Sequence, residues 1–166
     1  SEPVSRAMRN MAQAEAGASQ ATPFGGGQLP ARATALINGA TSHALDYDDT
    51  HFAHIGHPSV AVVSAALAVG EWTNASMNDV VLAALNGCEL SIRTGVLLGR
   101  AHYQIGFHQT ATAGAFGAAY AAALLLHKSP EHHHVALSLA STRAAGLKSQ
   151  FGTMGKPYNA GIAASN

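Results

Sequence analysis

The sequence predicts an all-α fold, a single multi-helix globular domain with close, Ala- and Gly-rich helix packing. Three observations favour this class. Apolar residues recur mainly at helical spacing, strand signals are weak throughout, and Ala and Gly dominate the composition. The length of 166 residues suits one domain. We therefore expect residues 1–166 to form one helical domain whose helices are joined by short connections.

The N-terminal part predicts two helices separated by a turn. Residues 1–22 are Ala-rich and predict a helix followed by a weak tail. The segment 23–30 is rich in Pro and Gly and predicts a flexible connector. Its glycine spacing fits neither the dinucleotide-binding pattern nor the phosphate loop. Pro30 suits the first turn of a second helix, which the apolar spacing extends to about Asp49.

The middle of the chain predicts two further helices. Residues 51–57 form a loop, and a proline then opens a largely apolar helix that ends near Trp72. Within this helix, residues 60–63 are rich in Val and could form a strand, but their Ala-rich continuation favours a helix. A capping-box-like start at 76–79 begins the next helix, which ends near Leu98.

The C-terminal part predicts three more helices. The first follows His108 and runs to about His127, and the second begins at Ser129 and ends near Gly146. A Gly-punctuated loop over 147–157 leads into the last. Small residues recur every four positions in the first of these helices, and we expect this stripe to admit a closely packed neighbour: Thr110, Gly114, Ala118 and Ala122.

Charge is unusually scarce in this sequence. Charged residues make up 11% of the chain, against about 25% in an average soluble protein. We expect a large surface covered by protein, either a dimer partner or a further domain, although an Ala-rich composition alone is the alternative. The net charge is zero and no basic stripe occurs, so nucleic acid is not an expected partner.

Other function classes are disfavoured on similar grounds. The most apolar stretch, 111–126, is shorter than the roughly 20 residues of a membrane span. No signal peptide is visible, and the single cysteine, Cys88, cannot form an internal disulfide, so we expect a cytoplasmic protein. We expect Cys88 itself to be a small buried hydrophobe. Because the chain starts without Met and stops in a helix-like run, both ends look cut.

An acidic segment at the end of the second predicted helix is the first candidate for chemistry. If that helix continues to Asp49, then His43, Asp46 and Thr50 share one face, with Tyr47 beside them. Asp48 and Asp49 then point elsewhere, and we expect both to be structural. An acid, an imidazole and a hydroxyl on one stripe suit proton transfer. The alternative is an ordinary acidic turn capped by the threonine. Carboxylates are unfavourable at the negative end of a helix dipole, however, and this tension points to function.

Basic side chains precede three predicted helices. His57, His108 and Lys156 each lie just before or at a helix N-terminus, where unpaired N–H groups and a positive partial charge favour anions. Together they would form a carboxylate-binding pocket, whereas each alone could be a loop-end residue without a chemical role. Arginines could also meet a carboxylate by bidentate pairing, but nothing local distinguishes one candidate from the others: Arg93, Arg100 and Arg143.

Histidine-rich segments raise the question of a metal site. The tract 132–134 is expected on a helix, where consecutive residues splay around the axis and do not share one ion. The spacing of His51, His54 and His57 is a better candidate, although a loop does not fix their arrangement. We expect no metal site.

Four motifs stand in order along the chain. They are Asn38-Gly39 with Ser42-His43-Ala44-Leu45-Asp46-Tyr47-Asp48-Asp49-Thr50-His51, then Gly56-His57-Pro58-Ser59, then Gly106-Phe107-His108-Gln109-Thr110-Ala111-Thr112-Ala113-Gly114, and Phe151-Gly152-Thr153-Met154-Gly155-Lys156-Pro157. At these segments the sequence resembles the MmgE/PrpD family, which includes 2-methylcitrate dehydratase, cis-aconitate decarboxylase and iminodisuccinate epimerase. The resemblance covers nearly the whole chain, most firmly from about Ala31 onward.

The resemblance implies a large helical domain and a smaller α/β lid domain, usually in homodimers. Residues 1–166 would be a truncated portion of the helical domain, without the lid and without a further active-site lysine that lies beyond this segment. We expect no cofactor. The expected catalytic residues are Asp46, His57, His108 and Lys156, and the expected substrate-binding residues are Thr50, His43, Gln109 and Thr110.

Two departures from the family pattern adjoin these residues. Gln109 stands where many members have Pro, and Gly155 stands where many have Thr or another small residue. Both positions could bear on the choice of substrate.

The expected reaction is dehydration of a small polycarboxylate such as 2-methylcitrate. Proton abstraction next to a carboxylate gives a carbanion that the site must stabilise, a role for Lys156 and the helix N-termini. Asp46 or His108 would be the base, and His57 or another group would protonate the leaving hydroxyl. Decarboxylation or epimerisation of a related polycarboxylate, such as cis-aconitate or iminodisuccinate, is the alternative within the family. A catalytically silent carboxylate-binding or structural protein is the alternative outside enzymes.

Overall fold

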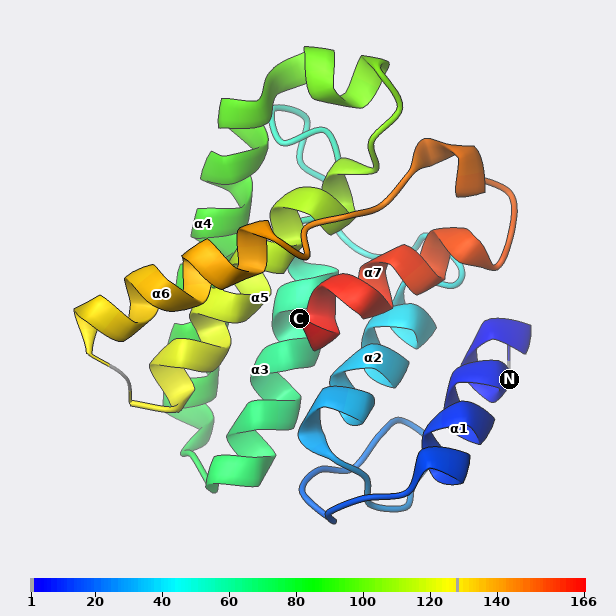
Figure 1. The fold of residues 1–166 in the computed structure, drawn as a ribbon, viewed down its shortest axis with the longest axis vertical. Coiled ribbons are helices and arrows are strands. Elements are labelled where there is room, and N and C mark those ends of the chain that lie inside the picture. Colours follow the sequence, from blue (N-terminus) through cyan, green and yellow to red (C-terminus); the bar gives the residue numbers. More distant parts are fainter. Residues whose placement is uncertain (1, 128) are drawn as a thin grey trace.

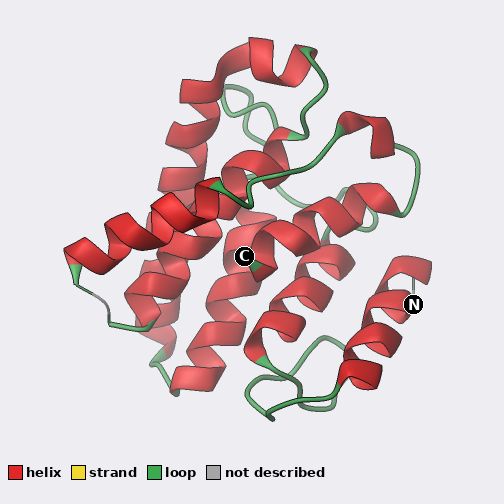
Figure 2. Ribbon diagram, in the orientation of Figure 1, coloured by secondary structure: helices red, strands yellow, loops and turns green. Residues whose placement is uncertain are grey.

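A computed structural model describes residues 2–127 and 129–166 and confirms the all-α class (Figures 1 and 2). Within these residues only isolated bridges pair extended backbone, and no strand forms. The helices are α1 Pro3–Glu15, α2 Ala31–Ser42, α3 Ser59–Thr73, α4 Met77–Gln104, α5 Gln109–Leu125, α6 Pro130–Ser141 and α7 Gly155–Ser165, with a short 3-10 helix, η1, at Lys148–Gln150. The Val-rich segment 60–63 lies in α3, as its Ala-rich continuation predicted.

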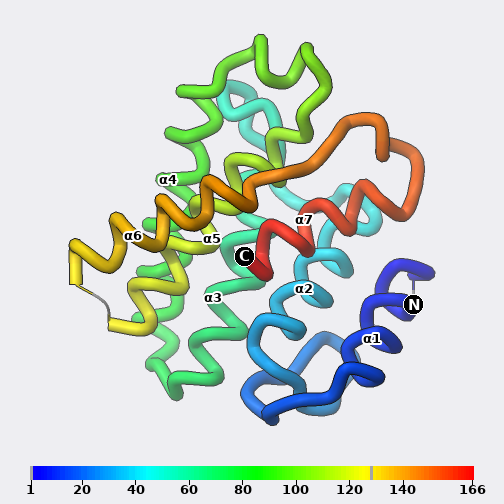
Figure 3. The backbone as a smooth tube through the Cα atoms, in the orientation of Figure 1, coloured from blue at the N-terminus to red at the C-terminus, as the bar shows by residue number. Residues whose placement is uncertain are grey.

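Helix α5 lies at the centre of the domain and packs against α3, α4, α6 and α7 (Figure 3). It is buried along most of its length because nearly all of its residues are small or apolar. On one side of this centre, α2 packs against α1, α3 and α7. The arrangement brings the N-terminal ends of α3, α5 and α7 into one region, which is where the candidate site forms.

Glycines set the spacing between the packed helices. A Cβ atom placed on Gly117 of α5 would lie 2.5 Å from the carbonyl oxygen of Gly87 in α4. Similarly, a Cβ atom on Gly161 of α7 would lie 2.6 Å from the carbonyl oxygen of Leu36 in α2. These backbones therefore touch, which explains why Ala and Gly dominate the composition. In the predicted small-residue stripe of α5, Gly114 faces Ala61 of α3.

Several predicted helix ends move in the structure. Helix α2 ends at Ser42 instead of Asp49, and α6 ends at Ser141 instead of Gly146. The hydroxyl groups of Ser141 and Thr142 donate to carbonyl oxygens of the last turn of α6, and this competition ends the helix. Helix α7 begins at Gly155, slightly before the predicted start at Pro157.

Helix α4 carries the capping motif predicted at its start. The Ser76 hydroxyl accepts a hydrogen bond from the backbone N–H of Asp79 at 3.2 Å. The predicted end near Leu98 coincides with a break at Gly99, whose φ of 68° and ψ of −179° are not helical. The helix then resumes and ends at Gln104.

The single cysteine behaves as the sequence predicted. Cys88 packs, partly buried, against an apolar cluster formed by α3, α4 and α5. Burial raises the pKa of its thiol to about 11, so the thiolate form is disfavoured at neutral pH.

An exposed apolar face on α4 accompanies the low charge of the sequence. Met77, Leu85 and Leu97 are 69%, 62% and 86% exposed. Helix α4 is long and apolar enough to cross a membrane, but core helices of soluble proteins can have the same length and composition. The face fits the expectation of a surface covered by protein, and the homodimer remains a prediction.

The contact between Gly87 and Gly117 gives a test of the packing. We expect Gly117→Ala to lower the free energy of unfolding by about 1–3 kcal/mol, because the new methyl group meets backbone that cannot rotate away. Gly114→Ala is the matched control, since it gains the same helix propensity but meets only the Ala61 methyl at 3.1 Å. Urea denaturation of both variants measures the difference. Equal stabilities would contradict the close backbone contact.

Candidate active site

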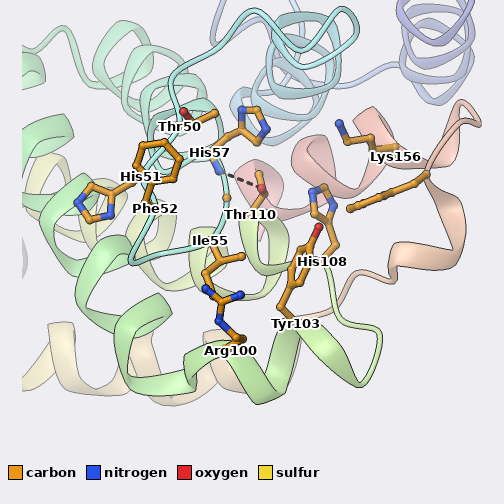
Figure 4. Close-up of a pocket in the computed structure, with 12 residues that line it drawn as sticks. Thr50, His51, Phe52, Ile55, His57, Arg100, Tyr103, His108, Thr110 and Lys156 are labelled. Atoms are coloured by element: carbon orange, nitrogen blue, oxygen red, sulfur yellow. Dashed lines mark hydrogen bonds between the residues drawn. The ribbon is translucent and has the colours of Figure 1, made fainter.

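Three helix N-termini converge on one cavity, as the positions of the basic residues predicted. His57 lies two residues before α3, His108 is the N-cap of α5, and Lys156 lies in the first turn of α7. All three line an open cavity of about 360 Å³ (Figure 4). Its wall is formed by Thr50, His51, Phe52, Ile55, Gly56, His57, Arg100, Tyr103, His108, Thr110, Phe151 and Lys156.

The acidic segment is a turn and not the end of a helix. Helix α2 stops at Ser42, and Asp46 adopts a left-handed conformation with φ of 56°. Aspartate tolerates this conformation better than most residues, which allows the chain to reverse here. The predicted helical stripe of His43, Asp46 and Thr50 is therefore wrong, although all three residues lie near the site.

Each aspartate of the segment has its own partner. Both carboxylate oxygens of Asp46 accept hydrogen bonds from the Lys156 ammonium, which α7 brings against α2. Asp49 accepts from the hydroxyl of Ser59, the first residue of α3. Asp48 contacts two histidines, as described next. The unfavourable repulsion among three acids in one segment is thus offset by three bases and a helix N-terminus.

Asp48 lies at the centre of the site, although a continuous helix would have directed its carboxylate elsewhere. Its Oδ2 atom lies 2.8 Å from Nδ1 of His43 and 3.3 Å from Nδ1 of His57. A carboxylate accepts hydrogen bonds only, so both Nδ1 atoms carry hydrogen. His57 consequently directs Nε2 toward Asp46, whose Oδ1 atom is 3.8 Å away. Asp48 therefore fixes both the orientation and the tautomer of His57.

The same contacts shift the pKa values of the pair in opposite directions. The hydrogen bond to Asp48 raises the pKa of His57 above 6.5, against the lowering effect of burial. Burial raises the pKa of Asp48, but hydrogen bonds and charge from His43 and His57 outweigh it and hold the pKa well below 3.8. Asp48 is thus an anion, and its charge stabilises the doubly protonated form of the His57 ring.

His108 has the opposite character from His57. Its side chain is almost fully buried, and burial, with the charges of His43 and Lys156, lowers its pKa to about 3. The Asn159 amide donates to the Leu147 carbonyl oxygen at 3.3 Å and lies 3.4 Å from Nδ1 of His108. The same NH2 group can donate to both, which makes Nδ1 of His108 an acceptor. His108 is therefore neutral, with its hydrogen on Nε2.

The loop before α3 is held by buried polar contacts. His54 is fully buried, its Nδ1 atom lies 3.1 Å from the Ser91 carbonyl oxygen, and burial lowers its pKa to about 4. Gly56 lies so close to α5 that a Cβ atom would be 2.8 Å from the Thr110 hydroxyl oxygen. That hydroxyl oxygen accepts the backbone N–H of His57 at 3.1 Å (Figure 4). These contacts fix the position of His57.

Five of the eight predicted site residues line the cavity, and Gln109, His43 and Asp46 do not. Gln109 is fully buried and donates to the Gly95 carbonyl oxygen in α4 at 2.7 Å, so it faces away from the cavity. His43 and Asp46 lie instead at a neighbouring cavity that shares Lys156. Sequence spacing missed Asp48 and gave no reason to prefer Arg100.

The predicted metal candidates are not brought together. His54 turns toward α4, so His51, His54 and His57 do not face a common point. Elsewhere in the described residues, His43, Asp46, Asp48 and His57 offer ligand atoms within 4.8 Å of one another, a set that could hold an ion. The Lys156 ammonium already supplies positive charge to this set through Asp46. The absence of a metal remains a prediction.

Known proteins resemble this chain along most of its length. The family model for the MmgE/PrpD N-terminal domain matches residues 1–166. The cis-aconitate decarboxylase of Aspergillus terreus is 35% identical over 148 residues, which cover 85% of this chain and 30% of that protein. The cis-aconitate decarboxylase of Homo sapiens is 31% identical over 144 residues, 84% of this chain and 30% of that protein. The chain thus spans about a third of the length of these curated relatives.

The pairing of Asp48 with His57 gives a test by titration. We expect Asp48→Asn to lower the pKa of His57, because the hydrogen bond to a carboxylate and the negative charge that raise this pKa are both lost. NMR titration of the His57 ring measures the change, and Asp49→Asn, whose partner is Ser59, is the control. An unchanged pKa in Asp48→Asn would contradict the assigned contact.

The same pairing predicts the direction of a stability change. The folded pKa of His57 lies above its ordinary value of 6.5, so its protonation stabilises the fold at lower pH. That contribution disappears as the pH rises through the folded pKa, and Asp48→Asn should weaken this dependence.

Proposed function

This chain belongs to the MmgE/PrpD family through its N-terminal domain, and on that premise we propose that the protein is a lyase acting on a small polycarboxylate. The observation that carries the proposal is the convergence of His57, His108 and Lys156 on one cavity. Cationic and N–H groups gather there, and none of the described residues in the cavity wall is an aspartate or a glutamate. Such a cavity suits a substrate with several negative charges.

Lys156 is the proposed first contact for a substrate carboxylate. It lines the cavity while its ammonium group holds Asp46, whose side chain is 49% exposed. A substrate carboxylate that approaches Lys156 competes with Asp46 for the ammonium group. The neutral Nε2–H group of His108 is a second donor, and the start of α5 adds the positive end of its dipole.

Decarboxylation of cis-aconitate is the reaction that the site and its relatives favour together. His57 has a raised pKa and directs Nε2 toward the Asp46–Lys156 pair, so it can carry a proton to the substrate. Free bases are scarce by comparison, because Asp46 and Asp48 are paired and Nδ1 of His108 lies against Asn159. The named relatives are cis-aconitate decarboxylases. Loss of CO2 from cis-aconitate leaves an electron pair that must take up a proton, which a proton donor in the site can supply.

The proposed step balances in bonds and charge. The bond between the substrate and the departing carboxylate breaks, CO2 leaves, and the electron pair of that bond forms a new C=C bond. The former alkene pair takes the proton from Nε2 of His57. Lys156 and His108 stabilise the remaining carboxylates, and Asp48 stabilises the protonated form of His57 beforehand.

Dehydration of a hydroxy-polycarboxylate such as 2-methylcitrate is the second candidate, and the Asp46–Lys156 pair favours it. If a substrate carboxylate draws Lys156 away, Asp46 becomes a free base 3.8 Å from Nε2 of His57. Asp46 would then remove a proton next to a carboxylate, and His57 would protonate the hydroxyl group that leaves as water. Both reactions use one acid, so product analysis must separate them.

The full-length protein tests the reaction directly. We expect it to release CO2 from cis-aconitate and to leave 2-methylcitrate unchanged, because the site offers a proton donor more readily than a base. Measurement of CO2 and of organic acids by NMR distinguishes the reactions. Conversion of 2-methylcitrate to an unsaturated tricarboxylate would favour the second candidate, and no turnover of either, or of iminodisuccinate, would contradict the proposal.

His108 gives a test by substitution. We expect His108→Ala in the full-length protein to reduce turnover by about 100-fold or more, because a positioned hydrogen-bond donor to the developing charge is lost. Circular dichroism and thermal melting should show a folded variant. His134→Ala, at an exposed histidine of α6, is the control and should keep full activity. A near-normal kcat in His108→Ala would contradict the catalytic role assigned to His108.

A further inference from the structure

Helix α4 changes direction beside the cavity, at Gly99. Its φ of 68° and ψ of −179° fall in a region that is accessible essentially to glycine alone. A Cβ atom at Gly99 would meet nothing within 4 Å, so the backbone conformation is the reason for glycine here, not a lack of space. Figure 1 shows the end of α4 bending away from the axis of the helix. The break directs Arg100 and Tyr103 toward the cavity, which both residues line.

Contacts from η1 hold the segment after the break. The Lys148 ammonium lies 3.7 Å from the centre of the Tyr103 ring and donates to the Tyr103 carbonyl oxygen at 3.1 Å. The backbone N–H of Lys148 donates to the Gly106 carbonyl oxygen at 2.8 Å. Lys148 is therefore engaged with the backbone and the ring, and Arg100 is the cation of this segment that faces the cavity.

Arg100 differs from Arg93 and Arg143 in having no polar partner among the residues that the structure describes. Arg93, about two turns earlier on α4, pairs with Glu89 at 2.6 Å, and Arg143 donates to Asn166 at 2.9 Å. The guanidinium group of Arg100 forms no hydrogen bond or ion pair with any residue that the structure describes. The cavity wall also contains no aspartate or glutamate that could pair with it. Figure 4 shows Arg100 extending from α4 toward the loop that carries His57.

We propose that Arg100 binds a second carboxylate of the substrate, and thereby selects tricarboxylates over shorter dicarboxylates. Lys156 and His108 bind one end of the substrate near His57, and the guanidinium group pairs with a carboxylate at the opposite wall. A guanidinium group holds a carboxylate through two parallel hydrogen bonds, so it fixes the direction as well as the charge of the substrate. The inference deepens the proposed function. Selectivity in turnover requires the proposed function, whereas the binding of an anion by Arg100 does not.

The first test compares arginine variants of the full-length protein on cis-aconitate. We expect Arg100→Gln to raise KM by about 10- to 100-fold, because a charged hydrogen-bonded contact is lost, with kcat changed by less than about threefold. Arg100→Lys should restore part of the affinity, since the charge remains without the paired geometry. Arg93→Gln, on the outer face of the same helix, is the matched control and should leave KM unchanged. An unchanged KM in Arg100→Gln would overturn the inference.

The second test uses the backbone break and needs no turnover. Calorimetry measures the binding of citrate and of glutarate, a tricarboxylate and a dicarboxylate. We expect Arg100→Gln to weaken citrate binding strongly and glutarate binding little, and Gly99→Ala, which disturbs only the backbone conformation, to do the same. If the protein turns over no polycarboxylate yet binds citrate through Arg100, the proposed function fails and this inference stands. Equal losses for citrate and glutarate, or no loss in Arg100→Gln, would overturn the inference.

Discussion

Two histidines and a carboxylate share one hydrogen-bonded centre, and the rest of the site depends on it. Oδ2 of Asp48 lies against Nδ1 of both His43 and His57. This contact places the proton of His57 on Nδ1, directs Nε2 toward Asp46, and stabilises the imidazolium form. It also requires the chain to turn sharply after α2, because a continuous helix would carry Asp48 away from both rings. The left-handed conformation of Asp46 is part of that turn.

Close helix packing supplies the frame that holds this centre. Backbone contact between Gly39 of α2 and Gly161 of α7 brings the start of α7, and with it Lys156, to Asp46. Gly56 lies against the start of α5 in the same way and positions the loop that carries His57. Small residues therefore have a functional consequence here. They allow three helix N-termini to approach one cavity, where a single bulky side chain would separate them.

The two histidines of the candidate site differ in charge because their surroundings differ. His57 neighbours a buried anion, and its pKa is raised. His108 is buried among cationic groups, and its pKa is lowered to about 3. One histidine is therefore suited to deliver a proton, and the other to donate a hydrogen bond while neutral.

The sequence by itself determined the helical class, the helix starts at proline and serine, and the positions of His57, His108 and Lys156 at helix N-termini. Those features depend on local spacing and on backbone chemistry, which are visible along the chain. The tertiary structure alone decided which aspartate pairs with which base. The position where α2 ends depends on the residues that the following turn contacts elsewhere in the fold. It likewise turned Gln109 toward α4 and distinguished Arg100 from other arginines. Pairing across the fold joins residues such as Asp46 and Lys156, 110 positions apart, and no local pattern records such a contact.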